Sequence, residues 1–145
     1  MNYDIARFIK AHELNYQRAL AEIKNGKKVS HWIWYIFPQI KGLGYSSMCN
    51  YYGIINLEEA KAYLAEPILR EHLIEICHAL LSLDTNDAAK VMGKPDDLKL
   101  KSSMTLFSTA DPDEKVFKKV LEKFFNGKSD DHTLRILGIY GDTNI

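Results

Sequence analysis

The most regular hydrophobic pattern in the chain lies in its first 25 residues. Between residues 3 and 25, apolar positions recur every third or fourth residue and form one stripe on a helix. The stripe comprises Ile5, Phe8, Ile9, His12, Tyr16, Ala19, Leu20 and Ile23. Gly26 follows, where a helix commonly ends, so the pattern predicts a helix over residues 3–25. A histidine on such a stripe, here His12, is more often a hydrogen-bonded core residue than a catalyst.

Capping signals predict further helices. Asn56, with an acid three residues later, opens a short helix, and Pro67 opens the next one as a first-turn proline. Residues 111–114 combine a cap, a proline and capping acids, and predict a third helix that ends at Gly127. A last short helix is expected over about residues 130–137.

In two segments the hydrophobic pattern does not distinguish a helix from a strand. Residues 29–37 are apolar on every side, and residues 98–106 alternate in part between apolar and polar side chains. We interpret both as helices. No repeat or linker divides residues 1–145, so the sequence predicts one domain. Its expected fold is mainly α, a compact bundle of about six to eight helices with room for a minor strand element.

Composition narrows the function classes. The 145 residues carry 19 Lys plus Arg and 19 Asp plus Glu, so the net charge of zero argues against a generic nucleic-acid binder. No secretion signal or membrane span is visible, and Cys49 and Cys77 share no metal-binding spacing. We therefore expect a cytoplasmic protein with reduced thiols, no metal and no cofactor. The oligomeric state stays open.

The first candidate site is the aromatic segment 30–39. Trp32 or Trp34 offers a face for a nucleotide ring, and His31 is a candidate acid or base near neutral pH. Ser30 and the amide of Gln39 are candidate ligand-binding groups. The alternative is a central core element with one buried polar residue, since aromatic side chains usually mark a core.

The second candidate site is the polar segment 96–105, which contains two acids, two lysines and three serines or threonines close together. On a helix, Lys99, Ser102 and Ser103 share one face, where they are candidates to hold a phosphate. Asp97 is a candidate base or ribose ligand. The alternative is a solvated helix start with ordinary caps.

Three segments resemble the signature blocks of a bacterial family catalogued as domain of unknown function 1810. They are SHWIWYIFPQIKGLG, EAKAYLAEPIL and PDDLKLKSSMTLF. The resemblance covers nearly the whole chain and implies a mostly helical domain without an established reaction; some members are labelled calpastatin. At His12 we would expect glutamine in this family, which argues against catalysis by His12. EAKAYLAEP and KSSMTLF are also faintly similar to helical N-glycosidases that act on ADP-ribose-type nucleotides.

These observations leave two hypotheses. The first is a protein that binds, and as an N-glycosidase-like or other hydrolase cleaves, a nucleotide-like or phosphorylated sugar ligand related to ADP-ribose or NAD. The alternative is a non-catalytic helical module for protein–protein interaction. For the first we expect the two segments to meet at one cleft, with His31 and Gln39 near Lys99 and Ser103. For the second we expect Trp32, Trp34 and Phe37 to form an exposed flat patch.

Overall fold

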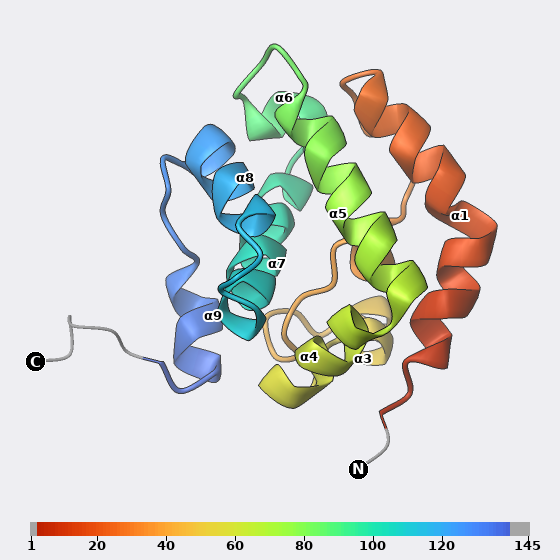
Figure 1. Cartoon of the computed structure of the whole chain (residues 1–145), viewed down its shortest axis with the longest axis vertical. Helices are drawn as coiled ribbons and strands as arrows, with labels where there is room; N and C mark the ends of the chain where they lie inside the picture. The colour runs from red at the N-terminus through yellow and green to blue at the C-terminus, as the bar shows by residue number, and fades with distance from the viewer. Residues whose placement is uncertain (1–2, 140–145) are drawn as a thin grey trace, which may run out of the picture.

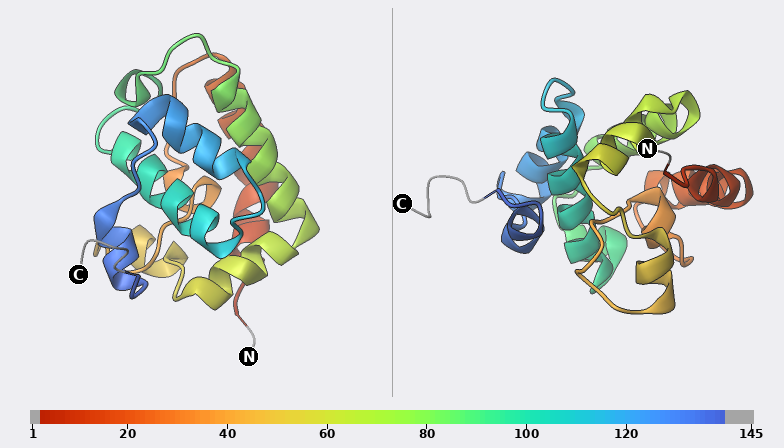
Figure 2. Two further views of the ribbon diagram at one scale, coloured as in Figure 1. Left: turned by 60° about the vertical axis from the view of Figure 1, so that its left-hand side comes forward. Right: turned by 90° about the horizontal axis from the view of Figure 1, so that it is seen from below.

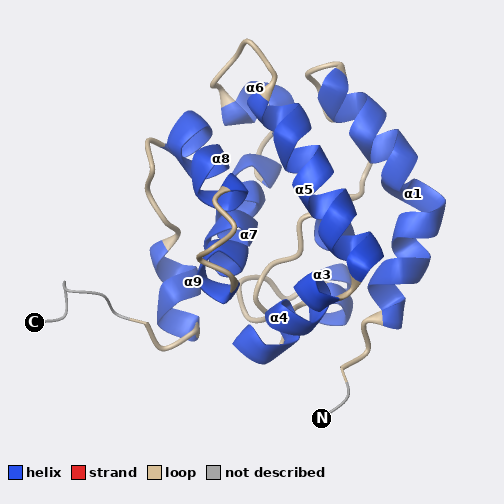
Figure 3. Cartoon of the chain, in the orientation of Figure 1, coloured by secondary structure: helices blue, strands red, loops and turns tan. Residues whose placement is uncertain are grey.

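A computed structural model describes residues 3–139, which consist of helices and connecting loops without a strand (Figure 3). Within this range lie nine helices, labelled in Figure 1. They are α1 (Ala6–Lys24), α2 (Ile33–Ile36), α3 (Ser47–Tyr52), α4 (Leu57–Ala65), α5 (Pro67–Leu81), α6 (Ala88–Met92), α7 (Asp96–Ala110), α8 (Val116–Phe125) and α9 (Asp131–Ile136). One hydrophobic core joins them, which confirms the predicted mainly α bundle.

Helix α7 is the central element of the bundle. It contacts α2, α4, α6, α8 and α9. Seen from below, it lies between α1 and α9 (Figure 2). Its buried residues include four with hydroxyl groups: Ser102, Ser103, Thr105 and Ser108. Three of these hydroxyls donate to carbonyls three or four residues earlier in the helix, which lets them be buried among apolar neighbours.

The predicted start signals of α4 and α5 are confirmed, and α9 begins where the last short helix was expected. Asn56 Oδ1 accepts a hydrogen bond from the backbone N–H of Glu59, and Pro67 is the first residue of α5. Asp130 Oδ2 accepts from the N–H of Thr133 at 3.0 Å. Each sequence signal therefore marks a helix start of the structure.

Helix α8 begins later than its start signal predicts. The first helical residue is Val116, and residues 111–114 form a turn before it. The guanidinium of Arg70 in α5 contacts the carboxylates of both Asp111 (3.1 Å) and Glu114 (3.5 Å). These two acids therefore tie the turn to α5 rather than open a helix at Asp111.

The two ambiguous segments have different outcomes. Residues 98–106 are helical and lie within α7, as predicted. The other segment, 29–37, is helical only over Ile33–Ile36, because its first residues are held against α1 by the carboxylate of Glu22. The sequence did not predict α3 and α6. In place of a strand, the described residues contain one isolated parallel bridge between Ile40 and Ile54.

Helix α1 packs most extensively against α5 and, next, against α2. Helices α1 and α5 lie side by side (Figure 1), and the short helix α2 packs against both α1 and α7. Helix α2 therefore connects α1 to the central helix. Of the helices within residues 3–139, none has both the length and the apolar character that crossing a membrane requires.

Candidate functional site

The aromatic segment and α7 meet at a cleft. Lys99 Nζ lies 5.4 Å from the centroid of the Trp34 ring, within the range of a cation–π contact. Beside this pair is a cleft of about 280 Å³. Its lining residues are Gln39, Leu43, Gly44, Cys49, Pro95, Leu98, Lys99, Ser102, Asp130 and His132. Gln39, Lys99 and Ser102 thus come together from segments about sixty residues apart.

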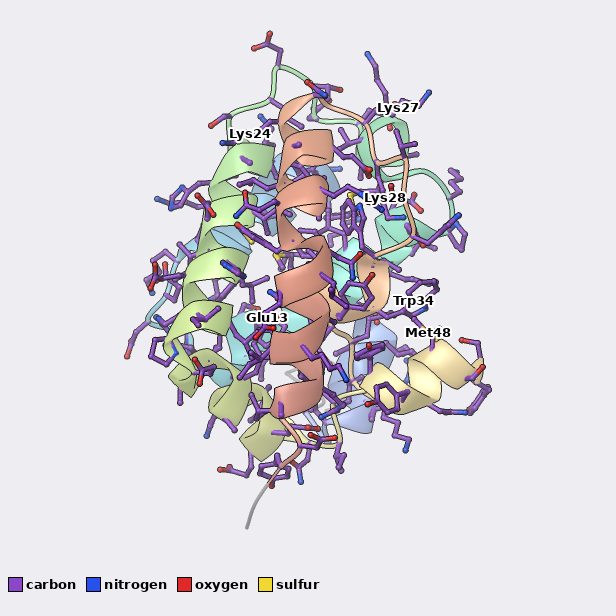
Figure 4. The ribbon with its side chains drawn as sticks, turned by 90° about the vertical axis from the view of Figure 1, so that its right-hand side faces the viewer. Glu13, Lys24, Lys27, Lys28, Trp34 and Met48 are labelled. Atoms are coloured by element: carbon purple, nitrogen blue, oxygen red, sulfur yellow. The ribbon has the colours of Figure 1, made fainter. Side chains whose placement is uncertain are left out.

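A smaller hollow of about 10 Å³, with room for about one water molecule, adjoins the cleft. Trp34 and Met48 line it from α2 and α3, and both are labelled in Figure 4. The two hollows share Gln39, Cys49 and the loop residues Leu43 and Gly44. The loop before α3 is therefore the common wall of both.

Asp96 fixes the lysine of the cleft. Its two carboxylate oxygens contact Lys28 Nζ at 2.8 Å and Lys99 Nζ at 3.5 Å. The Lys28 side chain is only 5% exposed, whereas that of Lys99 is 23% exposed. Asp96, in the first turn of α7, therefore links the aromatic segment to the helix that carries Lys99.

Glu22 of α1 anchors the start of the aromatic segment. It accepts hydrogen bonds from the backbone N–H groups of Val29 and Ser30, from Ser30 Oγ and from Trp32 Nε1. Burial raises the pKa of Glu22, but the hydrogen bonds from Ser30, Val29 and Trp32 outweigh it and lower the pKa to about 2. Ser30 and Trp32, two predicted ligand-binding residues, thus contact Glu22 rather than line the cleft, and Trp32 is buried.

Four other predicted residues also lie outside the cleft lining, and one of them, Trp34, lines only the smaller hollow. His31 is exposed on the surface. Asp97 Oδ1 and Ser103 Oγ are both buried and have no hydrogen-bond partner among the residues described. The geometry therefore brings Gln39 to Lys99, as predicted, but does not bring His31 or Ser103 there.

Sequence reasoning missed four residues with a role here: Glu22, Cys49, Asp130 and His132. The last two come from the start of α9, which was interpreted only as a helix. The clue to Cys49 was the pair Gly42 and Gly44, since glycine permits close approach to the backbone. A Cβ at Gly44 would lie 2.8 Å from Cys49 Sγ. No group of three or more His, Cys, Asp or Glu side chains within 3–139 is placed to hold a metal ion.

Comparison with known proteins supports the family resemblance. Residues 2–137 match the family described as Protein of unknown function (DUF1810). The chain belongs to this family. The description states no activity, and nothing in the match supports the calpastatin label. Among curated proteins, no sequence matches the chain significantly.

A solved relative has the same fold. The crystal structure of the conserved hypothetical protein Rv1873 from Mycobacterium tuberculosis is 38% identical to this chain, with a TM-score of 0.92. The match covers 94% of this chain and 98% of that protein. Its description names no ligand, so the likeness supports the fold and the family, and the function has to be argued from the cleft.

Proposed function

We propose that the cleft between α7 and residues 39–49 binds a small phosphorylated ligand of nucleotide or sugar-phosphate type, related to ADP-ribose or NAD, in the cytoplasm. The observation that carries the proposal is the Lys99 ammonium at a cleft with several hydrogen-bonding side chains, next to the Trp34 ring that lines the adjoining smaller hollow. A cation and an aromatic face are the groups that a phosphate and a base require.

Lys99 is suited to exchange its partner for a phosphate. It is the more exposed of the two lysines on Asp96, and its contact with that carboxylate is the longer one. When Lys99 turns to a ligand, Asp96 keeps Lys28 as its partner at 2.8 Å. No charge is then left buried and unpaired, which keeps the cost of the exchange low.

The other lining residues suit the rest of such a ligand. Gln39 offers an amide for the edge of a base or sugar, and His132 adds a second basic side chain from α9. Leu43 and Leu98 supply apolar surface. A volume of about 280 Å³ lies at the lower end for small-molecule sites, so the cleft suits a mononucleotide-sized group rather than a whole dinucleotide.

Binding has more support than hydrolysis. His31 and Asp97, the two residues predicted to be catalytic, do not line the cleft, so hydrolysis stays a prediction without either of them at the site. The interaction module also loses support, because Trp32 and Phe37 are buried and form no exposed patch with Trp34.

Thermal unfolding with added ligands tests the proposal. The probes are AMP, ADP-ribose, ribose 5-phosphate and inorganic phosphate. A ligand at about 100 times its Kd stabilises the protein by about 2.7 kcal/mol, so a binder raises Tm by several degrees. Lys99→Met is expected to abolish that rise. Lys101→Met, the same change two residues along α7 and outside the cleft lining, is expected to keep it. If none of the four probes raises Tm, or if Lys99→Met responds like Lys101→Met, the proposal is wrong.

A further inference from the structure

A pair of histidines joins α1 to α5 on the inner side of the bundle. His12 is 3% exposed, and its Nδ1 lies 2.9 Å from Nδ1 of His72. The two rings are nearly parallel, with an interplanar angle of 1°. Tyr16 stacks on His72 at 3.6 Å between ring centroids. Two ring nitrogens at this distance share one hydrogen, so one histidine donates and the other accepts.

The backbone of α2 decides which histidine is the donor. His12 Nε2 lies 2.8 Å from the carbonyl oxygen of Tyr35, and a carbonyl only accepts. Nε2 of His12 therefore carries the hydrogen, so its Nδ1 in the neutral ring is an acceptor. It follows that His72 donates from Nδ1. The Tyr63 hydroxyl lies 3.2 Å from His12 Nε2 and 3.4 Å from the same carbonyl; since Nε2 carries a hydrogen, the hydroxyl donates to the carbonyl.

A proton on His12 Nδ1 would face the N–H of His72, so protonation of His12 either breaks their hydrogen bond or moves the hydrogen of His72 to its Nε2. Burial lowers the pKa of His12 to about 4, against the favourable contact with the Tyr35 carbonyl and together with the repulsion of His72. Burial also lowers the pKa of His72, although Glu75 and Glu71 oppose this. Both histidines are therefore neutral at pH 7.

Within residues 3–139, the groups around the pair include two acids near His72 but no anion bonded to either imidazole. They are Tyr16 from α1, the carbonyl and phenol of Tyr35 from α2, Tyr63 from α4, and Glu71 and Glu75 from α5. Glu75 accepts a hydrogen bond from the Tyr16 hydroxyl at 2.5 Å. Among the residues described, neither glutamate hydrogen-bonds to an imidazole, so a His12 cation would lack a direct partner.

The carbonyl that His12 holds belongs to the residue directly after Trp34. We infer that His12 is a positioning residue for α2. While the histidine pair is neutral, its hydrogen bonds to His72 and to the Tyr35 carbonyl hold α2, and with it Trp34 beside the cleft. Protonation of both rings breaks the histidine–histidine bond and loosens this hold. The consequence for ligand binding rests on the proposed function of the cleft; the positioning itself does not. Because the pKa of His12 is about 4, the pair stays neutral in a mildly acidic environment, and only a pH near 4 or below loosens this hold.

The decisive variant is His12→Gln. The amide of glutamine has one donor and one acceptor, so it can donate to the Tyr35 carbonyl and accept from His72 without taking up a proton. His78→Gln is the matched control, because His78 is exposed on α5 and its side chain has no hydrogen bond in the described structure. The readouts are NMR signals between pH 7.5 and 3.5 and denaturant unfolding between pH 7.5 and 4.5, both without ligand.

In the wild type we expect ring-nitrogen signals that place the hydrogen on Nε2 of His12 and on Nδ1 of His72 at pH 7. On acidification, the indole N–H signal of Trp34 is expected to move with the protonation of His12. The indole of Trp32, which is bonded to Glu22, is the internal reference. In His12→Gln the shift of the Trp34 signal is expected to be lost, and in His78→Gln it is expected to remain.

Unfolding gives the size of the effect. With a pKa of 6.5 in the unfolded chain and about 4 in the fold, the unfolded state takes up the proton first as the pH falls. The folding equilibrium constant then drops by roughly 70-fold more in the wild type than in His12→Gln between pH 7.5 and 4.5. Equal pH dependence in both proteins, the opposite tautomers, or a Trp34 signal that does not follow His12 would each overturn the inference. A missing response to nucleotides would refute only the proposed function.

Discussion

The substitution Glu59→Gln tests the ion pair that fixes the wall of the smaller hollow. Arg7 Nη1 contacts Glu59 Oε2 at 2.9 Å, and the two side chains are 7% and 1% exposed. The other carboxylate oxygen accepts from the N–H of Ile55 at 2.7 Å. Arg7 also donates to the carbonyls of Tyr51 and Gly53, at the end of α3. This pair therefore joins α1 and α4 to the segment that lines the smaller hollow.

Glutamine keeps the shape of Glu59 but can satisfy only one of its two neighbours. Both Arg7 and the N–H of Ile55 donate, whereas an amide has one oxygen, so its NH₂ group must face a donor. Removing one partner of a buried ion pair typically costs about 3–5 kcal/mol, because the other charge stays buried without compensation. For a chain of this length, this corresponds to a fall in Tm of roughly 6–20 °C.

Calorimetry or urea unfolding of four proteins measures this cost. They are the wild type, Glu59→Gln, Arg7→Met and the double variant. Because Arg7 and Glu59 share their main interaction, the double variant is expected to lose at least about 1 kcal/mol less than the sum of the single losses. Glu58→Gln is the matched control: its side chain is 68% exposed, so a change within about 0.5 kcal/mol is expected. A Glu59→Gln loss within about 1 kcal/mol of the control, or strictly additive effects, would refute the reasoning.

Two further predictions concern the start of the aromatic segment and the loop that follows it. Glu22→Gln is expected to lower stability at pH 7, and in urea unfolding its difference from the wild type should shrink as the pH falls from 5 toward 3. The reason is that a carboxylate whose pKa is lowered from 4.5 to about 2 stabilises the fold fully above pH 4.5 and progressively less below it. A difference that stays constant with pH would contradict this. Gly44→Ala is expected to lower Tm, since the new Cβ would lie 2.8 Å from Cys49 Sγ. Adding Cys49→Ala to the same chain should restore part of the lost Tm. A double variant with the same loss of Tm as Gly44→Ala would count against this contact.

The fold was predictable where a helix has one buried side, and less so where it is buried on several. The stripe of α1 is visible in the sequence because its other side faces solvent. Helix α7 lacks such a stripe, and the partial alternation of residues 98–106 also fits a strand. Its buried Ser102, Thr105 and Ser108 break the apolar pattern, and only the helix itself supplies the carbonyls that accept their hydrogen bonds.

The sequence predicted which types of residue form the candidate site better than it predicted which side chains they contact. Lys99, Gln39 and Ser102 were selected because their side chains suit a ligand, and they line one cleft. Ser30 and Trp32 were selected on the same ground, but the carboxylate of Glu22 uses their donors. Glu22 lies on the polar side of α1 and looks like any solvated acid in the sequence. Competition between a protein partner and a ligand for the same donor is decided only by tertiary structure.

The two lysines of Asp96 show how such a competition is decided. Lys28 lies over the ring of Trp32, and Lys99 lies over the ring of Trp34. The sequence pattern therefore does not distinguish a structural lysine from one that could bind a ligand. Burial separates them: Lys28, with a side chain only 5% exposed, requires a permanent anion, because an unpaired buried charge is very costly. Asp96 supplies that anion from the first turn of α7, where the helix dipole favours a carboxylate. Lys99, which is more exposed and farther from Asp96, is the lysine to which the proposed function assigns the ligand.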